Sequence, residues 1–204
     1  MSPPADLRAL IRDIPDFPKP GIVFKDITPL LLDPHALDAT VEGIAEWAGP
    51  RGVEFVVAAE ARGFILGAAI ARELGAGFVP ARKPGKLPAE VVTAEYILEY
   101  GIDALEMHAD ALAHGARVLI HDDLLATGGT ARALAELIQR LGGTVVGCAF
   151  LVELAFLDGR AKLGGYDVHA LVSDYGEWPP RGARARELRR RAAVSVSGPW
   201  AACP

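Results

Sequence analysis

Residues 120 to 132 read IHDDLLATGGTAR, and the architecture of the chain can be worked out from this stretch. An apolar run at 118 to 120 leads into two adjacent carboxylates, Asp122 and Asp123. A glycine-rich turn follows at 127 to 130, and apolar residues at helical spacing follow the turn. A buried strand, a polar turn and a helix in this order are typical of one unit of an open α/β sheet.

Apolar runs and amphipathic segments alternate along the rest of the chain. Runs rich in β-branched residues predict buried strands at 53 to 58, 77 to 80, 117 to 120, 144 to 152 and 168 to 172. Apolar residues spaced three and four apart predict helices at 4 to 14, 33 to 47 with Asp33 as N-cap, 63 to 74, and 130 to 141. We therefore predict an α/β fold with an open, mostly parallel twisted sheet flanked by helices. Residues 82 to 100 are polar with prolines and glycines, so we expect them outside the core.

The composition favours a soluble protein with one ordinary domain. The 204 residues carry a net charge of −5, so neither nucleic acid nor an anionic membrane is an expected partner. The two cysteines, Cys148 and Cys203, have neither a disulfide framework nor a metal-binding spacing. The N-terminus lacks the apolar core of a signal peptide, and no apolar run is long enough to span a membrane. We therefore expect a cytoplasmic protein.

The acid pair and the turn after it have opposite binding preferences. Two carboxylates inside a dry strand would cost several kcal/mol, so we expect Asp122 and Asp123 at the strand end, facing solvent or ligand. There they can accept hydrogen bonds from sugar hydroxyls or hold a cation. The turn at 126 to 130 offers free N–H groups, the hydroxyls of Thr127 and Thr130, and the positive end of a helix, which suits a phosphate. Together these groups indicate a phosphorylated sugar as the ligand.

Two other phosphate-binding motifs are absent. No lysine follows the glycines at 128 and 129, so the P-loop pattern is missing. The glycines at 75 and 77 precede a strand, which is the wrong order for a dinucleotide site. The remaining alternative is an exposed turn that caps a helix and binds nothing.

The stretch VLIHDDLLATGGT resembles the signature of the type I phosphoribosyltransferases, which bind phosphoribosyl pyrophosphate. The residues LLATGGT within it are similar to the adenine branch of that family in particular. Further segments resemble the same branch: FPKPGIVFKDITPLL at 17–31, EARGFILG at 60–67, RKPGKLP at 82–88, YILEYG at 96–101 and LVEL at 151–154. The resemblance covers residues 8 to 175 in order. His121 departs from it, because the family usually has an apolar residue before the acid pair.

The resemblance implies one phosphoribosyltransferase domain at 1–175, with a small N-terminal hood at about 1–32 and a flexible lid at about 84–98. Residues 176–204 match nothing in the family. Six arginines lie between 181 and 191, which leaves open a contact with an anion or a second subunit. We favour a flexible, solvated C-terminal extension.

The resemblance also implies an activity. Adenine and phosphoribosyl pyrophosphate would give AMP and pyrophosphate in purine salvage, with Mg²⁺ held mainly by the substrate and by no direct protein ligand. A homodimer is expected. Two alternatives stay open: a phosphoribosyltransferase for a 6-oxo purine, and a regulator that senses phosphoribosyl pyrophosphate without catalysis.

The donor-binding residues follow from the matched motifs. The 5′-phosphate would be held by the turn Ala126, Thr127, Gly128, Gly129 and Thr130. Asp122 and Asp123 would accept from the ribose hydroxyls and favour a cationic sugar ring. Arg62 is expected to grip pyrophosphate, in a loop where the resemblance implies a cis peptide bond at Glu60–Ala61. In the basic cluster of Arg82, Lys83 and Lys86, Lys83 is the expected pyrophosphate ligand.

The base would lie under the hood. Phe24 would stack on one face of adenine and Leu154 would cover the other, while backbone groups near Val23 and Lys25 would read the ring edge. Glu99 resembles the general acid/base that protonates adenine N7, and Tyr100 lies beside it at the base of the lid. Arg62 and Glu99 are therefore the expected catalytic residues.

Overall fold

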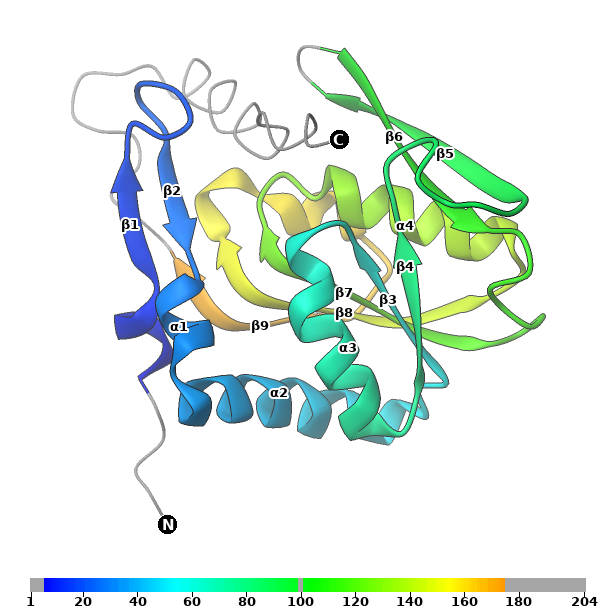
Figure 1. The fold of residues 1–204 in the computed structure, drawn as a ribbon, viewed down its shortest axis with the longest axis horizontal. Coiled ribbons are helices and arrows are strands. Elements are labelled where there is room, and N and C mark those ends of the chain that lie inside the picture. The colour runs from blue at the N-terminus through cyan, green and yellow to red at the C-terminus, as the bar shows by residue number, and fades with distance from the viewer. Residues whose placement is uncertain (1–5, 99–100, 175–204) are drawn as a thin grey trace.

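The computed structural model describes residues 6–98 and 101–174, and a five-stranded parallel sheet forms its centre (Figure 1). The strand order is β4-β3-β7-β8-β9, and every neighbouring pair is parallel. The strands are β3 Phe55–Ala59, β4 Gly77–Ala81, β7 Arg117–Leu125, β8 Thr144–Leu154 and β9 Val168–Asp174. The predicted open parallel sheet is confirmed.

Helices cover both faces of the sheet, which explains why the strands are near-continuous apolar runs. On one face lie α2 Pro34–Ala48 and α3 Arg62–Leu74 (Figure 1). On the other face lie α4 Gly129–Arg140 and a β-hairpin of β5 Val91–Leu98 and β6 Gly101–His108. Each layer buries its own apolar cluster against the sheet.

Local capping defines the helix boundaries, as predicted. The carboxylate of Asp33 accepts hydrogen bonds from the N–H groups of His35 and Ala36 at 2.9 and 3.0 Å, so α2 begins at Pro34. Shorter helical segments lie at α1 Thr28–Leu32, η1 Leu7–Leu10, η2 Gly49–Arg51, η3 Ala155–Leu157 and η4 Gly159–Leu163. In the part of the chain that the structure describes, no helix is long and apolar enough to cross a membrane.

The predicted helix at 4 to 14 is wrong beyond residue 10. The chain forms η1 and then strand β1 Arg12–Pro15, which pairs with β2 Val23–Asp26 in an antiparallel hairpin. Ile14 lies opposite Phe24 in this register. The apolar spacing of three and four could not reveal a strand partner that follows after Pro18 and Pro20. This hairpin stands at one side of the sheet (Figure 1), within the segment predicted as the hood.

The expectation that residues 82 to 100 lie outside the core is also wrong. Ala94 on β5 is completely buried, and Val92 and Tyr96 pack against the same cluster as α4. These three side chains alternate with the more polar Thr93 and Glu95, which is the period of a half-buried strand. Most of the segment predicted as a lid, 84–98, is therefore a regular strand in a hairpin.

Candidate active site

Three loops follow the carboxyl ends of β3, β4 and β7, the edge at which open α/β sheets bind ligands. The loop after β3 carries Glu60 and Arg62. The loop after β4, residues 82–86, carries the basic cluster and is called the basic loop below. The loop after β7, residues 126–130, is called the phosphate turn.

The acid pair lies inside β7, because this strand continues to Leu125. Asp122 is half-buried and opposite Phe150 of β8, whereas Asp123 is only 3% exposed. The strand predicted at 117 to 120 therefore ends five residues too early, and the acid pair expected at its end lies within β7. Burial, followed by the charge of Asp123, raises the pKa of Asp122 well above its usual value. Burial also raises the pKa of Asp123, although the neighbouring Arg62 opposes this shift.

Arg62 supplies the charge that lets Asp123 be buried. Its Nη1 lies 3.2 Å from Oδ2 of Asp123, and its guanidinium lies over the Phe24 ring at 4.9 Å from the centroid. Both Nη1 and Oδ2 are buried and, within the described residues, make no hydrogen bond of good geometry. The structure thus brings together predicted donor-binding and base-binding residues, with hydrogen-bonding capacity left for a ligand.

The phosphate turn lines a hollow beside the acid pair. The lining residues are Asp122, Leu124, Leu125, Ala126, Thr127, Gly128, Gly129, Thr130, Ala131 and Phe150. Gly128 has a φ of 76°, and a side chain there would collide with the carbonyl oxygen of Gly159. Helix α4 begins at Gly129, so its first N–H groups point toward this hollow. All five predicted residues of the turn therefore line one cavity.

The loop after β3 has the expected backbone. The peptide bond between Glu60 and Ala61 is cis, as predicted. The next helix begins at Arg62, and a Cβ at Gly63 would lie 2.9 Å from Oδ1 of Asp122. The absence of a side chain at Gly63 therefore lets α3 approach the acid pair closely.

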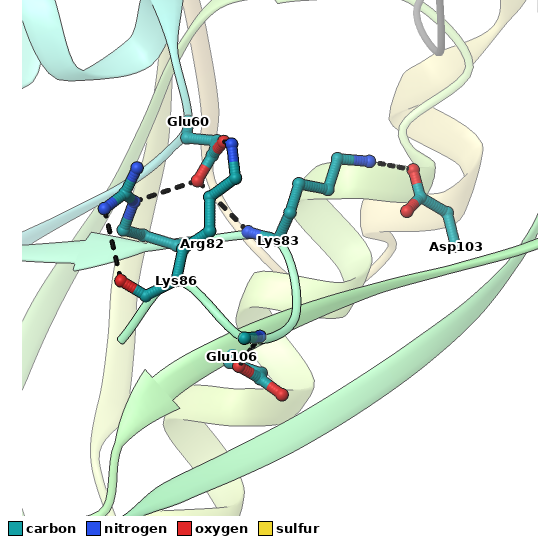
Figure 2. Close-up of polar contacts among 7 residues, drawn as sticks. Glu60, Arg82, Lys83, Lys86, Asp103 and Glu106 are labelled. Atoms are coloured by element: carbon teal, nitrogen blue, oxygen red, sulfur yellow. Dashed lines mark hydrogen bonds and ion pairs between the residues drawn. The ribbon is translucent and has the colours of Figure 1, made fainter. Parts of the chain in front are cut away.

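The basic loop is held by carboxylates (Figure 2). Glu60 accepts from Nε of Arg82 and from Nζ of Lys86, both at 2.9 Å, and from the backbone N–H of Lys83 at 3.2 Å. Burial alone would raise the pKa of Glu60, but the hydrogen bonds from Lys86, Lys83 and Arg82 lower it below its usual value. The ammonium of Lys83 pairs with Asp103 on β6. The structure therefore joins Lys83 to the hairpin rather than to the acid pair.

The predicted base-binding residues lie on the hood and on β8. Phe24 meets Phe17 edge to face at 5.3 Å, and Val23 is 40% exposed. Leu154 is buried at the end of β8. The side chain of Lys25 is buried and forms ion pairs, so only its backbone is available for the predicted contact with a base. Glu99 and Tyr100 lie outside the described residues.

Two polar residues near the site, Tyr96 and Asp103, were not predicted. The Tyr96 ring lies beside the phosphate turn, since a Cβ at Gly129 would be 3.6 Å from its Cδ2 atom. The Tyr96 hydroxyl donates to Asp103 at 3.0 Å. The alternation of apolar residues at 92, 94 and 96 was the available signal, because it places Tyr96 on the inward face of β5.

Comparison with known proteins agrees with this geometry. A family model for the phosphoribosyl transferase domain matches residues 35–173. The adenine phosphoribosyltransferase of Gloeobacter violaceus is 58% identical over 169 residues, which are 82% of this chain and 99% of that protein. The enzyme of that name from Rubrobacter xylanophilus is 56% identical over 168 residues, covering 82% of this chain and 91% of that protein.

The chain belongs to the adenine phosphoribosyltransferase family.

Solved structures of this family have the same fold. The crystal structure of adenine phosphoribosyltransferase from Thermoanaerobacter pseudethanolicus superposes with a TM-score of 0.81 at 55% identity, covering 83% of this chain and 98% of that one. The enzyme from Giardia lamblia, complexed with 9-deazaadenine, has a TM-score of 0.80 at 39% identity and covers 84% of this chain and 97% of that one. The predicted resemblance and the predicted fold are both confirmed.

Proposed function

We propose that the protein transfers the phosphoribosyl group of phosphoribosyl pyrophosphate to adenine, releasing AMP and pyrophosphate. One observation carries this proposal: Arg62 bridges the acid pair and the Phe24 ring, with the phosphate turn beside them. Arg62 therefore links the acid pair, which would bind the sugar, to an aromatic ring that would bind the base. Membership of the adenine phosphoribosyltransferase family supports the same reaction.

The donor would lie across the carboxyl ends of the strands. The phosphate turn would hold the 5′-phosphate through its N–H groups and threonine hydroxyls. Asp122 and Asp123 would accept from the ribose hydroxyls, and Arg62 would exchange its contact with Asp123 for pyrophosphate oxygens. An arginine fork suits such an exchange, because its geometry matches both carboxylate and phosphate oxygens.

In the transfer, a bond forms between adenine N9 and the anomeric carbon while the bond from that carbon to pyrophosphate breaks. Positive charge develops on the sugar ring, and the two aspartates would stabilise it. Adenine loses one imidazole proton in this step. Glu99 would take that proton from N7 as general base and return it as general acid in the reverse reaction, a role that rests on the resemblance. Phe24 and Leu154 would cover the two faces of the base, while backbone groups near Val23 and Lys25 would read its edge.

Mg²⁺ would accompany the donor. Phosphate, hydroxyl and water oxygens are ligands this ion prefers, and the carboxylates of Asp122 and Asp123 would balance its charge without binding it directly. The pyrophosphate and the ribose hydroxyls would be its main ligands. When bound, the ion would neutralise part of the charge on the leaving group.

We also propose a homodimer and a cytoplasmic setting. The family resemblance implies a homodimer in which an arginine-bearing loop of one subunit nears the site of its partner. Equilibrium sedimentation measures the mass of the particle, and a mass of one chain at micromolar concentration would contradict the dimer.

A panel of bases tests the proposed reaction. Adenine, hypoxanthine, guanine and orotate are each incubated with phosphoribosyl pyrophosphate and Mg²⁺, and pyrophosphate release is measured. We expect release with adenine and at least about 100-fold less with the 6-oxo purines. These bases have a carbonyl oxygen where adenine has an amine, so their donors and acceptors would not match a site that binds the amine. Release with hypoxanthine but not adenine would assign the protein to another base, and no release with any base would remove the enzymatic proposal.

A further inference from the structure

Asp103 lies where the β-hairpin meets the basic loop. It is opposite Tyr96 in the register of β5 and β6, and its side chain is 17% exposed. Its Oδ2 accepts the Tyr96 hydroxyl at 3.0 Å and pairs with the Lys83 ammonium, while Oδ1 accepts the N–H of Ala104 at 2.9 Å. Figure 2 shows Lys83 extended from the basic loop toward this carboxylate. One carboxylate therefore holds a lysine and a tyrosine that come from separate segments.

The backbone of the basic loop is held without Asp103. Arg82 and Glu106 exchange backbone hydrogen bonds of 2.9 and 2.8 Å. The side chain of Glu106 accepts the N–H of Gly85 at 2.9 Å, and Glu60 holds the other side of the loop. Asp103 therefore orients the Lys83 side chain, and the loop itself has other supports.

Lys83 spans the space between two anion-binding segments. Its backbone N–H donates to Glu60, which lies in the loop after β3 that also carries Arg62. Its ammonium, at Asp103, is linked through Tyr96 to the phosphate turn, because the Tyr96 ring packs beside Gly129. Burial and then the charge of Asp103 raise the pKa of Tyr96, so its hydroxyl stays protonated and donates to the carboxylate.

We propose that Asp103 is a positioning residue for phosphoribosyl pyrophosphate: it fixes the ammonium of Lys83, which extends from beside the loop after β3 toward the phosphate turn. The proposal rests on the proposed function, since it assumes that donor. An ammonium has three N–H donors and Asp103 takes one, which leaves donors for phosphate oxygens. A free lysine side chain has many rotamers, and fixing it beforehand lowers the entropy lost when the donor binds.

Asp103→Asn tests the proposal, because asparagine keeps the shape and removes the charge. We expect the KM for phosphoribosyl pyrophosphate to rise about tenfold, with kcat and the KM for adenine changed less than about twofold, as for loss of uniform binding. Asp103→Glu keeps the charge and should restore most of the affinity. Tyr96→Phe removes one hydroxyl and should raise the same KM by about threefold. Asp110→Asn, on an exposed turn after β6, is the matched control and should behave as wild type.

Two readouts separate this inference from the proposed reaction. Calorimetry of donor binding without any base should show the same tenfold weakening in Asp103→Asn, whichever base the enzyme uses. In the substrate-free protein, acylation of Lys83 relative to the exposed Lys19 should increase in Asp103→Asn, because the ammonium is released. Thermal unfolding checks that each variant is folded. If Asp103→Asn is not folded, Tyr96→Phe, which removes the other hydrogen bond to the same carboxylate, carries the test.

Three outcomes would overturn the inference. A lower donor KM in Asp103→Asn would show that the carboxylate competes with substrate. An unchanged donor affinity would show that Lys83 does not need it. A loss of kcat at constant KM would place its role in catalysis rather than in positioning. Failure of the wild type to release pyrophosphate with adenine would count against the proposed function. The role of Asp103 would then be tested by calorimetry of donor binding alone.

Discussion

Arg62 and Asp123 form an ion pair at the carboxyl end of the sheet, with 3.2 Å between Nη1 and Oδ2. The same guanidinium lies over the ring of Phe24. In the substrate-free protein one side chain therefore neutralises a buried carboxylate and covers the aromatic platform. Both contacts have to be exchanged when the proposed substrates bind, which makes Arg62 the link between the sugar and base positions.

Arg62→Lys keeps the charge but removes the planar fork. We expect kcat/KM to fall about 100-fold, because an ammonium can neither make a bidentate contact with pyrophosphate nor stack on Phe24 as a guanidinium does. Steady-state kinetics with both substrates measures the loss. Arg72→Lys, an exposed position on the same helix, is the control and should change kcat/KM less than about twofold. An unchanged kcat/KM in Arg62→Lys would contradict the role.

Asp122→Asn should stabilise the substrate-free protein while it lowers activity. The raised pKa of Asp122 means that the folded state keeps a proton which the unfolded chain has lost. Stability therefore falls as pH rises from the ordinary aspartate value of about 3.9 through the raised folded value. We expect the variant to be more stable than wild type by about 1 kcal/mol at pH 7, and the gain to shrink toward pH 4.

Urea unfolding of both proteins between pH 4 and 8 measures that difference. The hydrogen bond from the Asp123 N–H to Oδ1 of residue 122, 3.0 Å long in the wild type, can be kept by asparagine. A variant less stable than wild type at pH 7 would show that the charged pair is favourable in the absence of substrate.

His121→Val should remove a source of acid sensitivity. His121 is completely buried, its Nδ1 lies 3.0 Å from the carbonyl oxygen of Ala149, and within the described residues its Nε2 has no hydrogen-bond partner. Burial lowers its pKa to about 4. The unfolded chain therefore takes up a proton first, and stability is lost as pH falls from about 6.5 toward the folded value. Valine cannot be protonated, so it removes this loss of stability at low pH, and it also removes the unpaired nitrogen.

Thermal unfolding at pH 7 and pH 5 tests the His121 prediction. We expect the wild type to lose more stability between these values than His121→Val does, by about 1 kcal/mol. His35→Val, at the exposed start of α2, controls for the removal of any histidine. If the wild type and His121→Val lost the same stability between pH 7 and pH 5, the prediction would be wrong.

Lys25→Met should loosen the hood. The Lys25 ammonium lies 2.7 Å from Asp13 and 2.6 Å from Asp174, and both Lys25 and Asp174 are buried. Removal of one partner from a buried ion pair lowers the free energy of unfolding by about 3 kcal/mol, and urea unfolding measures this loss. Because β2 also carries Val23 and Phe24, we expect the KM for adenine to rise more than the KM for the donor. Lys19→Met, an exposed change in the same hood, should alter neither.

Glu99→Gln tests the role implied by the family resemblance. Removal of a general acid/base lowers turnover by about 100-fold or more. We expect kcat to fall by that amount while calorimetric affinity for phosphoribosyl pyrophosphate stays within about twofold. Unchanged turnover would remove the role from Glu99.

Much of the fold followed from short-range signals. The cap at Asp33 with Pro34, the parallel strands and the phosphate turn were all predicted, because capping, glycine conformation and burial pattern act over a few residues. The hairpin of β1 and β2 and the buried face of β5 were not predicted. Both depend on a partner surface, α4 in the case of β5, that a local pattern does not reveal.

From the sequence alone came the strand, glycine turn and helix around residues 120 to 132, since each of these depends on its own residues and their neighbours. Only the tertiary structure decided how the charges pair: Arg62 with Asp123, Lys83 with Asp103, and Lys25 with Asp174. A charged side chain can pair with any opposite charge within reach. Which one it meets depends on how distant elements pack, and the pairing then determines which charges remain for a ligand.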